Sequence, residues 1–384
     1  MKYILFLLLL TAPSCYSVAQ VYQTGRRSIT FTDPSRNGRA INTELYYPAN
    51  STGNNLPIAT GNTKFPVVVF GHGFVIPYSS YTWLADSLVK YGYIAALPTT
   101  ESSFSPSHEQ FGKDLAFLCQ YIFSLNDSAN SFLFGRVSNR SAVGGHSMGG
   151  GSSFLATGYH NGINAIFNFA AAETNPSAKN AALHVQLPAL IFSGSADCIV
   201  PDSNQLRLYN NVPYPCKSFI NITNGLHCHF ANNDGTCATG QFLSGCNSSS
   251  ITAQAVFQKT ATLLVPFLDY YLKDSCGSRG IFDNRLAAMT GVNKEQSCLT
   301  DPFICSASST LFEFTGTGNW DVAGNWTNGT IPPLLLPPNA SIIINPSGNT
   351  DCVLNVIQTI SAGASLKVTE GKNFVVQGNL TILR

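Results

Sequence analysis

Gly145-His146-Ser147-Met148-Gly149 is the stretch that decides the fold, because a G-x-S-x-G motif needs a particular backbone setting for its chemistry. The residues before it, 141–144, indicate a short buried strand, and the small residues after it, 150–156, open a helix. A serine at such a strand–turn–helix corner is held in a strained conformation that exposes its hydroxyl above a sheet. The motif therefore predicts that Ser147 is a nucleophile.

An acid and a base follow the serine at the ends of two further predicted strands. Apolar residues 188–192 indicate a buried strand, and Asp197 lies just beyond its carboxyl end, where catalytic groups gather in parallel sheets. A second apolar stretch, 218–222, precedes His227. The order serine, acid, histidine is the one found in α/β-hydrolases. We expect His227 to take and return the proton of Ser147, and Asp197 to orient the imidazole.

Each of these residues also has a purely structural interpretation. The serine could begin a helix in a nucleotide-binding loop, although no lysine follows it as that loop requires. Asp197 could be only a helix N-cap, and Asp202 and Asp234 are then the alternative acids. His229 competes for the role of base, because one loop cannot bring two such histidines to one serine. The glycine turn directly before His227 favours His227.

The loop after an earlier strand is expected to supply the second half of an oxyanion hole. Residues 65–70 are wholly apolar and predict a buried strand, and Gly71-His72-Gly73-Phe74 follows. We expect the backbone N–H groups of Met148 and Phe74 to bind the oxyanion, with Val75 as the alternative to Phe74. The same glycines could instead mark only a tight strand exit.

Strands and helices alternate through residues 41–272, which predicts a mostly parallel sheet with helices on both faces. The expected strands are 41–47, 67–70, 94–98, 141–145, 165–170, 189–193 and 218–222, and the expected helices are 81–90, 111–125, 149–159 and 252–272. Only the short segment 171–187 separates the strands expected at 165–170 and 189–193, which leaves no room for a cap there. We therefore expect a lidless catalytic domain over residues 20–305, with an open cleft that suits bulky or polymeric esters.

Residues 306–384 differ in pattern from the rest of the chain. Short apolar runs alternate with turn residues and no helical period is present, which predicts a small all-β module like the start of a β-helix. Trp320 and Trp326 either cover the open end of such a solenoid or form a platform that contacts a glycan.

The N-terminus and the composition indicate export. Lys2 and the short apolar run 3–10 are typical of a signal peptide, which is expected over residues 1–19 and is too short to span a membrane. Lysine and arginine (21) nearly balance aspartate and glutamate (20), so nucleic acid is not an expected partner. We expect a secreted, extracellular monomer with no membrane span, no metal and no cofactor.

The cysteine content predicts disulfides. Cys15 falls in the signal peptide, which leaves ten of the 11 cysteines, an even number in an exported chain. Zinc bound by Cys228, Cys237 and Cys246 is an alternative, but an oxidising compartment and the absence of C-x-x-C spacing argue against it. Closeness in sequence favours three pairs: Cys276 with Cys298, Cys198 with Cys216, and Cys305 with Cys352.

Taken together, these motifs resemble a known family. Residues 20–298 are similar to the family that holds bacterial polyester hydrolases, cutinases and chlorophyllase-like dienelactone hydrolases. The resemblance is carried by Gly71-His72-Gly73-Phe74, Gly145-His146-Ser147-Met148-Gly149-Gly150, Ser195-Ala196-Asp197 and Gly225-Leu226-His227, and by the cysteine pair Cys276 and Cys298.

The resemblance implies an α/β-hydrolase fold and a secreted serine carboxylesterase of the polyesterase or cutinase type, similar to poly(ethylene terephthalate) (PET) hydrolases. It also implies that Phe74 stacks on the substrate and that the positions of His146 and Glu173 border the substrate. Two other functions stay open. One is a lipase or chlorophyllase-like esterase that acts on lipid or soluble esters, and the other is a non-enzymatic surface adhesin with an inactive hydrolase fold.

Overall fold

A computed structural model of the chain describes residues 21–232, 235–246, 249–298, 301–303, 305, 311–336, 340–361 and 364–383. The expected signal peptide lies outside these residues. Among the helices that are described, none has the length and apolar character needed to cross a membrane.

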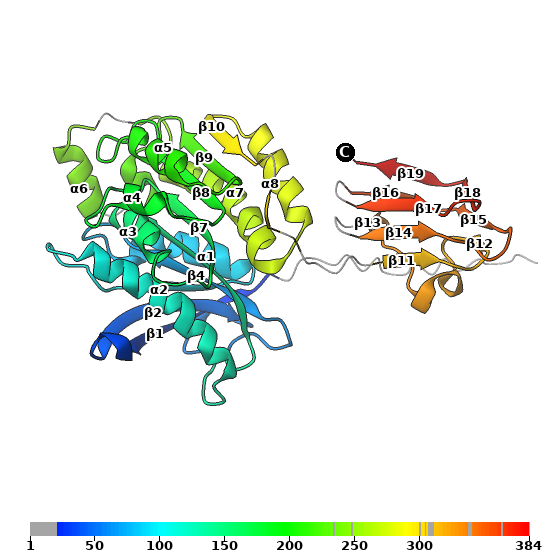
Figure 1. Cartoon of the computed structure of the whole chain (residues 1–384), viewed down its shortest axis with the longest axis horizontal. Coiled ribbons are helices and arrows are strands. Elements are labelled where there is room, and N and C mark those ends of the chain that lie inside the picture. Colours follow the sequence, from blue (N-terminus) through cyan, green and yellow to red (C-terminus); the bar gives the residue numbers. More distant parts are fainter. Residues whose placement is uncertain are drawn as a thin grey trace, which may run out of the picture.

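A ten-stranded sheet forms the centre of the larger domain, in the order β10-β9-β8-β7-β6-β4-β5-β2-β1-β3 (Figure 1). Antiparallel pairs complete both edges, and the two-residue β3 is parallel to its neighbour β1. The edge strands are β1 (Gln23–Asp33), β2 (Arg39–Ala49), β3 (Gly53–Asn54) and β10 (Val292–Ser297). The strands between them are parallel: β4 (Phe65–Gly71), β5 (Ile94–Pro98), β6 (Val137–His146), β7 (Ile163–Phe169), β8 (Ala189–Gly194) and β9 (Lys217–Ile222). The expected mostly parallel sheet is confirmed.

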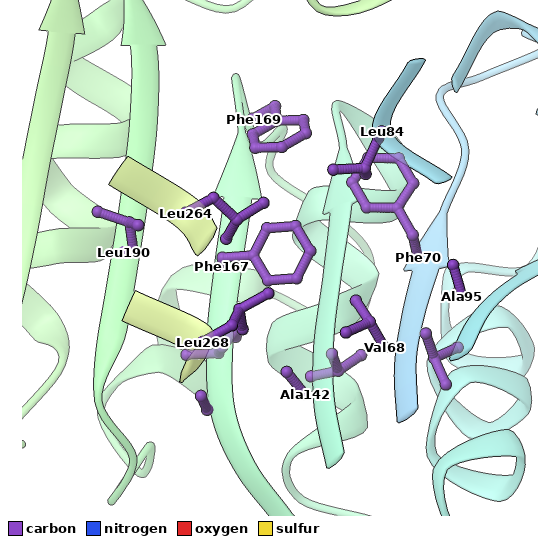
Figure 2. Close-up of a cluster of buried hydrophobic side chains, with 14 of the residues drawn as sticks. Val68, Phe70, Leu84, Ala95, Ala142, Phe167, Phe169, Leu190, Leu264 and Leu268 are labelled. Carbon is purple, nitrogen blue, oxygen red and sulfur yellow. The ribbon is translucent and has the colours of Figure 1, made fainter. Parts of the chain in front are cut away.

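Helices cover both faces of this sheet. α2 (His108–Ser124) and α3 (Met148–Ala156) pack against each other and against β4 and β6. On the other face, α1 (Thr82–Lys90) and α7 (Ala253–Lys273) pack together, and Figure 2 shows Leu264 and Leu268 of α7 against Phe167 of β7. The remaining helices are α4 (Ala178–Ala182), α5 (Asp202–Asn211), α6 (Gly235–Leu243) and α8 (Gly277–Ala288).

The core explains why the central strands are so apolar. All seven residues of β4 are buried, as a strand covered on both faces requires. Phe70 of β4 stacks on Phe167 of β7 with ring centroids 6.0 Å apart, and both rings are buried (Figure 2). Burial of each such ring contributes about 1.5–3 kcal/mol. The strands therefore form a rigid support for the loops at their carboxyl ends.

The order in which successive strands are added to the sheet reverses between β4 and β6. β5 lies on one side of β4, whereas β6, β7, β8 and β9 follow one another on the other side. In open parallel sheets, ligand sites form at the carboxyl ends of strands at such a switch point. The loop after β4, which carries Phe74, and the turn after β6, which carries Ser147, both begin there.

Seven elements of the larger domain lie outside the pattern that the sequence predicts: β1, β3, β10, α4, α5, α6 and α8. The helix expected over 149–159 ends at Ala156. β10 shows the physical reason. Its six residues, VNKEQS, are mostly exposed and carry no apolar alternation, so the strand forms only because β9 presents a free edge.

Four disulfides join Cys198 to Cys246, Cys216 to Cys298, Cys228 to Cys237 and Cys276 to Cys305. All three predicted pairings are wrong, including the pair Cys276–Cys298. For Cys216 and Cys298 the pairing follows the sheet: Lys217 of β9 lies opposite Ser297 of β10, which brings the two cysteines together. The disulfides of Cys228, Cys237 and Cys246 also exclude the zinc alternative.

The two remaining cysteines of the described chain are free thiols. Cys119 is buried in α2 and Cys352 is buried in the C-terminal module. Burial raises the pKa of both thiols to about 12, so neither is a reactive thiolate at neutral pH. The expectation that all ten cysteines pair is therefore wrong.

The described residues between 311 and 383 form three parallel, three-stranded sheets (Figure 1). Each successive turn of the chain adds one strand to each sheet, which is the arrangement of a β-helix. The sheets are β11 (Leu311–Phe314), β14 (Ser341–Ile344) and β17 (Ser365–Val368); β12 (Gly318–Asn319), β15 (Asp351–Leu354) and β18 (Asn373–Val376); and β13 (Leu335–Leu336), β16 (Ile357–Ile360) and β19 (Asn379–Ile382).

Trp320 and Trp326 belong to the interior of this module. Both rings are buried, their centroids are 4.7 Å apart, and Trp326 Nε1 donates to the Trp320 carbonyl oxygen at 2.6 Å. Because neither ring is exposed, the alternative in which the two tryptophans form a glycan platform is wrong.

Candidate active site

Ser147 lies at the sharp turn between β6 and α3. Its φ of 52° and ψ of −117° fall outside the regions that non-glycine residues normally occupy, and such strain concentrates at functional sites. The turn closes because glycines flank it. A Cβ atom on Gly145 would overlap the backbone of Gly149, and a Cβ atom on Gly149 would overlap the backbone of Gly71. Any larger residue would push β6, α3 and the neighbouring strand apart.

Asp197 and His227 meet at the ends of β8 and β9. His227 Nδ1 and Asp197 Oδ2 are 2.7 Å apart, and both side chains are buried. Asp197 Oδ1 accepts the backbone N–H groups of Ile199 and Val200 at 2.9 and 2.8 Å. Both oxygens of the carboxylate therefore accept hydrogen bonds. Because the carboxylate accepts from Nδ1 of the imidazole, the ring proton lies on Nδ1 and Nε2 is left as an acceptor. Asp197 thus caps a turn, and it also binds the histidine.

Ser147 and His227 line the same pocket, which has a volume of about 280 Å³. No hydrogen bond joins the Ser147 hydroxyl to His227 in this structure, although both residues are described and both face the pocket. Such hydrogen bonds are often long without substrate and tighten in the complex. The other residues of the wall include Phe74, Val75, Ile76, Ile199 and Thr236.

The loop after β4 presents free backbone N–H groups beside the serine. Ile76 N–H donates to the Gly73 carbonyl oxygen at 3.1 Å, which closes a turn around Phe74 and Val75. Val75 has a φ of 49°, a strained conformation for a β-branched residue. Within the described part of the chain, neither the Phe74 N–H nor the Met148 N–H, at the start of α3, donates a hydrogen bond. Both donors are available to a developing oxyanion.

His146 and Glu173, which the resemblance places beside the substrate, are not among the residues that line this pocket. His146 is fully buried behind the nucleophile, where its ring nitrogens face the Tyr81 hydroxyl and the His227 carbonyl oxygen. Glu173 is exposed near the start of α4 and accepts a hydrogen bond from Ser177 Oγ. Both positions were placed by resemblance alone, and their neighbours in this chain give them other contacts.

α6 forms a wall of the pocket that the sequence pattern does not predict. Thr236 and Gly240 of α6 and Ser244, directly after it, line the pocket at intervals of four residues. Residues at this spacing share one side of a helix. The segment 171–187, which is expected to be too short for a cap, carries only the five-residue α4. The cleft is therefore bordered by a helix from a different connection, after His227.

Three contacts tie α6 to the loops of the acid and the base. Cys228, next to His227, is bonded to Cys237 in α6, and Cys198, next to Asp197, is bonded to Cys246 after α6. The Cys228 N–H also donates to Gln241 Oε1 at 3.1 Å. A cysteine directly after each of Asp197 and His227 was the sequence signal that could have revealed this link.

One group of possible metal ligands lies together in the described residues: Cys216, Cys298 and Asp301. The two cysteines form a disulfide, and Asp301 accepts the hydroxyl of Tyr271 at 2.7 Å. These side chains are committed to one another, and the group lies outside the pocket of Ser147.

Residues 23–244 match the model of the PETase family, described as PET hydrolase-like, and this span is more than half of the chain. The chain belongs to this family. The PET hydrolase-like span includes Ser147, Asp197, His227 and all of α6.

Curated proteins similar to this PET hydrolase-like chain carry names of ester-cleaving enzymes. Cutinase est1 of Thermobifida alba is 24% identical over 168 residues, which are 43% of this chain and 54% of the relative. Bis(hydroxyethyl) terephthalate hydrolase of Streptomyces coelicolor is 25% identical over 174 residues, 44% of this chain and 53% of the relative. Cutinase cut1 of Thermobifida fusca is 24% identical over 168 residues, which are 43% of this chain and 50% of the relative. The chain spans about half the length of the curated relatives it matches.

Proposed function

We propose that this chain is a secreted serine esterase that hydrolyses carboxylic esters of the polyester type through an acyl-enzyme on Ser147. The observation that carries the proposal is the buried 2.7 Å hydrogen bond between His227 and Asp197, in a pocket that the strained Ser147 also lines. A nucleophile, a base and an acid in this relation are the parts of a serine hydrolase.

The first half of the reaction forms an ester on Ser147. Its Oγ attacks the carbonyl carbon of the substrate while His227 Nε2 takes the hydroxyl proton, and Asp197 stabilises the resulting imidazolium. The oxyanion accepts hydrogen bonds from the backbone N–H groups of Met148 and Phe74, at the positive end of α3. The imidazolium then gives its proton to the alcohol oxygen as the bond between that oxygen and the acyl carbon breaks.

Water completes the cycle. His227 takes a proton from the water while the water oxygen attacks the acyl carbon, and the same N–H groups bind the second oxyanion. The bond between the acyl carbon and Ser147 Oγ then breaks, and the proton passes from His227 to that oxygen. The carboxylic acid is released and the serine hydroxyl is restored.

Aromatic side chains at the pocket support polymeric or aromatic esters as the substrate class. Phe74 lines the pocket with 44% of its surface exposed, and the ring of Phe104, which is 85% exposed, lies 6.2 Å from it. Exposed rings beside a nucleophile offer flat surfaces on which extended or aromatic acyl groups stack. The names of the relatives, cutinases and a bis(hydroxyethyl) terephthalate hydrolase, agree with this class.

The disulfides support secretion. Four disulfides lie in the larger domain, and two of them hold α6 at the pocket. Bonds of this kind form and persist in oxidising, extracellular compartments.

Removal of the Ser147 hydroxyl tests the proposal. We expect Ser147→Ala to lower kcat on p-nitrophenyl butyrate by about 10³–10⁶-fold, because only the nucleophilic oxygen is lost. Ser152→Ala is the matched control: the Ser152 hydroxyl is buried in α3 with no hydrogen-bond partner among the described residues, so its loss should leave the rate unchanged. Circular dichroism checks the fold of both variants. A Ser147→Ala protein with substantial turnover would rule out Ser147 as the nucleophile.

A second assay separates the substrate classes. Hydrolysis is measured on p-nitrophenyl esters from acetate to palmitate and on an aromatic polyester film. Release of soluble product from the film, abolished by Ser147→Ala, supports the polyesterase. Turnover confined to lipid or soluble esters would instead assign a lipase or chlorophyllase-like esterase, and a folded protein inactive on every ester would assign the adhesin.

A further inference from the structure

Three buried hydrogen bonds connect the oxyanion loop to the loop of the base, through the residue that precedes the nucleophile. The Gly73 N–H donates to the Tyr81 hydroxyl oxygen at 3.0 Å, and that oxygen is 2.8 Å from His146 Nδ1. His146 Nε2 is 3.1 Å from the backbone carbonyl oxygen of His227. Tyr81 and His146 are fully buried, and none of these residues uses its side chain in the reaction derived above except His227.

The environment of His146 determines where its proton lies. Burial, together with the neighbouring His227, holds the pKa of His146 well below its ordinary value, so its ring is neutral at neutral pH. A carbonyl oxygen can only accept, so the ring proton sits on Nε2 and is donated to His227. Nδ1 is then an acceptor, and the Tyr81 hydroxyl donates to it. The Gly73 N–H thus donates to the Tyr81 hydroxyl, and that hydroxyl donates to His146 Nδ1. The His146 Nε2–H in turn donates to the His227 carbonyl oxygen.

We propose that Tyr81 and His146 are positioning residues, which hold the backbone of the oxyanion loop and the backbone of the base in fixed relation to Ser147. This inference rests on the proposed esterase function and adds two residues to it. His146 precedes Ser147 directly, so the same strand end that presents the nucleophile also sets the position of the base.

The position of His227 is constrained from two sides. Asp197 holds its Nδ1, and the ring of His146 packs beside its ring with centroids 4.6 Å apart while bonding its carbonyl oxygen. Without the contact to His146, His227 keeps its hydrogen bond to Asp197 but loses the support behind its imidazole ring. A displacement of about 1 Å at a reacting group can cost about 10²-fold in rate.

The position of the oxyanion loop is constrained by Tyr81. Gly73 precedes Phe74, whose N–H is one of the two proposed oxyanion donors, and Val75 carries a strained φ of 49°. A strained turn keeps its conformation only where neighbouring contacts hold it. The Tyr81 hydroxyl holds Gly73, the first residue of this turn.

The test compares variants that break the connection with one that keeps it. We expect Tyr81→Phe and His146→Leu to lower kcat on p-nitrophenyl acetate by about 10–100-fold with little change in KM, because the small substrate binds as before while the reacting groups are misplaced. His146→Gln should stay within about threefold of the wild type, because its amide can donate to the His227 carbonyl and accept from Tyr81. The double variant Tyr81→Phe/His146→Leu should lose about as much as one single variant, since residues of one network are not additive.

Tyr47→Phe is the matched control for loss of a buried tyrosine hydroxyl. Tyr47 is fully buried in β2, outside the pocket wall, and its hydroxyl donates to the Leu56 carbonyl oxygen at 2.6 Å. It should lower the melting temperature as Tyr81→Phe does, yet leave kcat unchanged. If His146→Leu does not fold, Tyr81→Phe and His146→Gln still carry the comparison.

Three results would overturn the inference: wild-type kcat in the folded Tyr81→Phe variant, an equal loss in Tyr47→Phe, or additive losses in the double variant. Each of these leaves the esterase intact. Failure of the proposed function is distinct, because it appears as a wild-type protein without turnover or as an active Ser147→Ala variant.

Discussion

Two histidines that lie two residues apart have different surroundings, and this difference supports the proposal that His227, and not His229, is the base. His227 is buried, bonds Asp197 and packs beside His146. His229 is half-buried, and its Nδ1 accepts the Leu226 N–H at 3.2 Å, which closes the turn after β9. Burial lowers the pKa of His229, so the ring stays an uncharged acceptor for that N–H at neutral pH.

Replacing each histidine in turn tests this assignment. We expect His227→Ala to lower kcat on p-nitrophenyl butyrate by about 10³–10⁶-fold, as loss of the base does in serine hydrolases. His229→Ala should cost about 0.5–1.5 kcal/mol of stability, the worth of one hydrogen bond, and leave kcat nearly unchanged. Steady-state kinetics and thermal unfolding measure the two effects. The reverse order of severity would transfer the role of base to His229.

At the scale of single elements, α6 is the part of the pocket wall whose own sequence least favours its structure. It is a short helix with glycines at both its start and its middle, Gly235 and Gly240, which disfavour a helix. The disulfides that join α6 and the residues after it to the loops of Asp197 and His227 hold the helix in place despite its low helix propensity. Gly240 lines the pocket, and apart from the neighbouring backbone of α6 no described atom lies within 4 Å of where its Cβ would be.

A larger side chain at Gly240 should therefore narrow the pocket without a clash. We expect Gly240→Leu to lower kcat/KM on p-nitrophenyl octanoate by about tenfold or more relative to the acetate, because each misfit methylene costs about 1–3 kcal/mol in an apolar site. Gly235→Leu is the matched control, since Gly235 lies in the same helix, is equally open and is outside the pocket wall. Equal effects of the two substitutions, or an unchanged chain-length profile, would show that α6 does not set substrate size.

At the scale of the whole molecule, the described residues form two hydrophobic cores. One cluster of buried residues fills the α/β domain, and a second, separate cluster fills the β-helix around Phe314, Trp320 and Ile342. Every residue proposed for catalysis lies in the α/β domain. A domain with its own core can fold alone.

Removal of the β-helix should therefore spare the chemistry. We expect a chain ending at Cys305 to hydrolyse p-nitrophenyl butyrate with a kcat/KM within about twofold of the full chain, because its core and all four disulfides remain. On a polyester film, a lower rate for the shortened chain would measure attachment by the module, since linked modules raise effective concentration. A shortened chain that is folded by circular dichroism but inactive on the soluble ester would contradict the independence of the domains.

The features that the sequence determines by itself are those whose signal lies in neighbouring residues. A strand, a glycine turn and the start of a helix surround Ser147 without interruption, and Asp197 and His227 each follow an apolar strand by a few residues. Apolar periodicity and turn chemistry act over one element at a time, so they identify the parallel strands, the main helices and these three side chains. They also identify the change to short β runs after residue 306.

Only the tertiary structure decides which distant segments meet. The polar strand β10 forms because β9 has a free edge, and this ladder alone brings Cys216 to Cys298. α6 borders the pocket because two disulfides hold it there, and His146 reaches the His227 carbonyl only once β6 and β9 lie in one sheet. The physical reason is that these contacts join residues far apart in the chain. Burial of the shared core brings such residues together, and no local preference in their own sequence records the meeting.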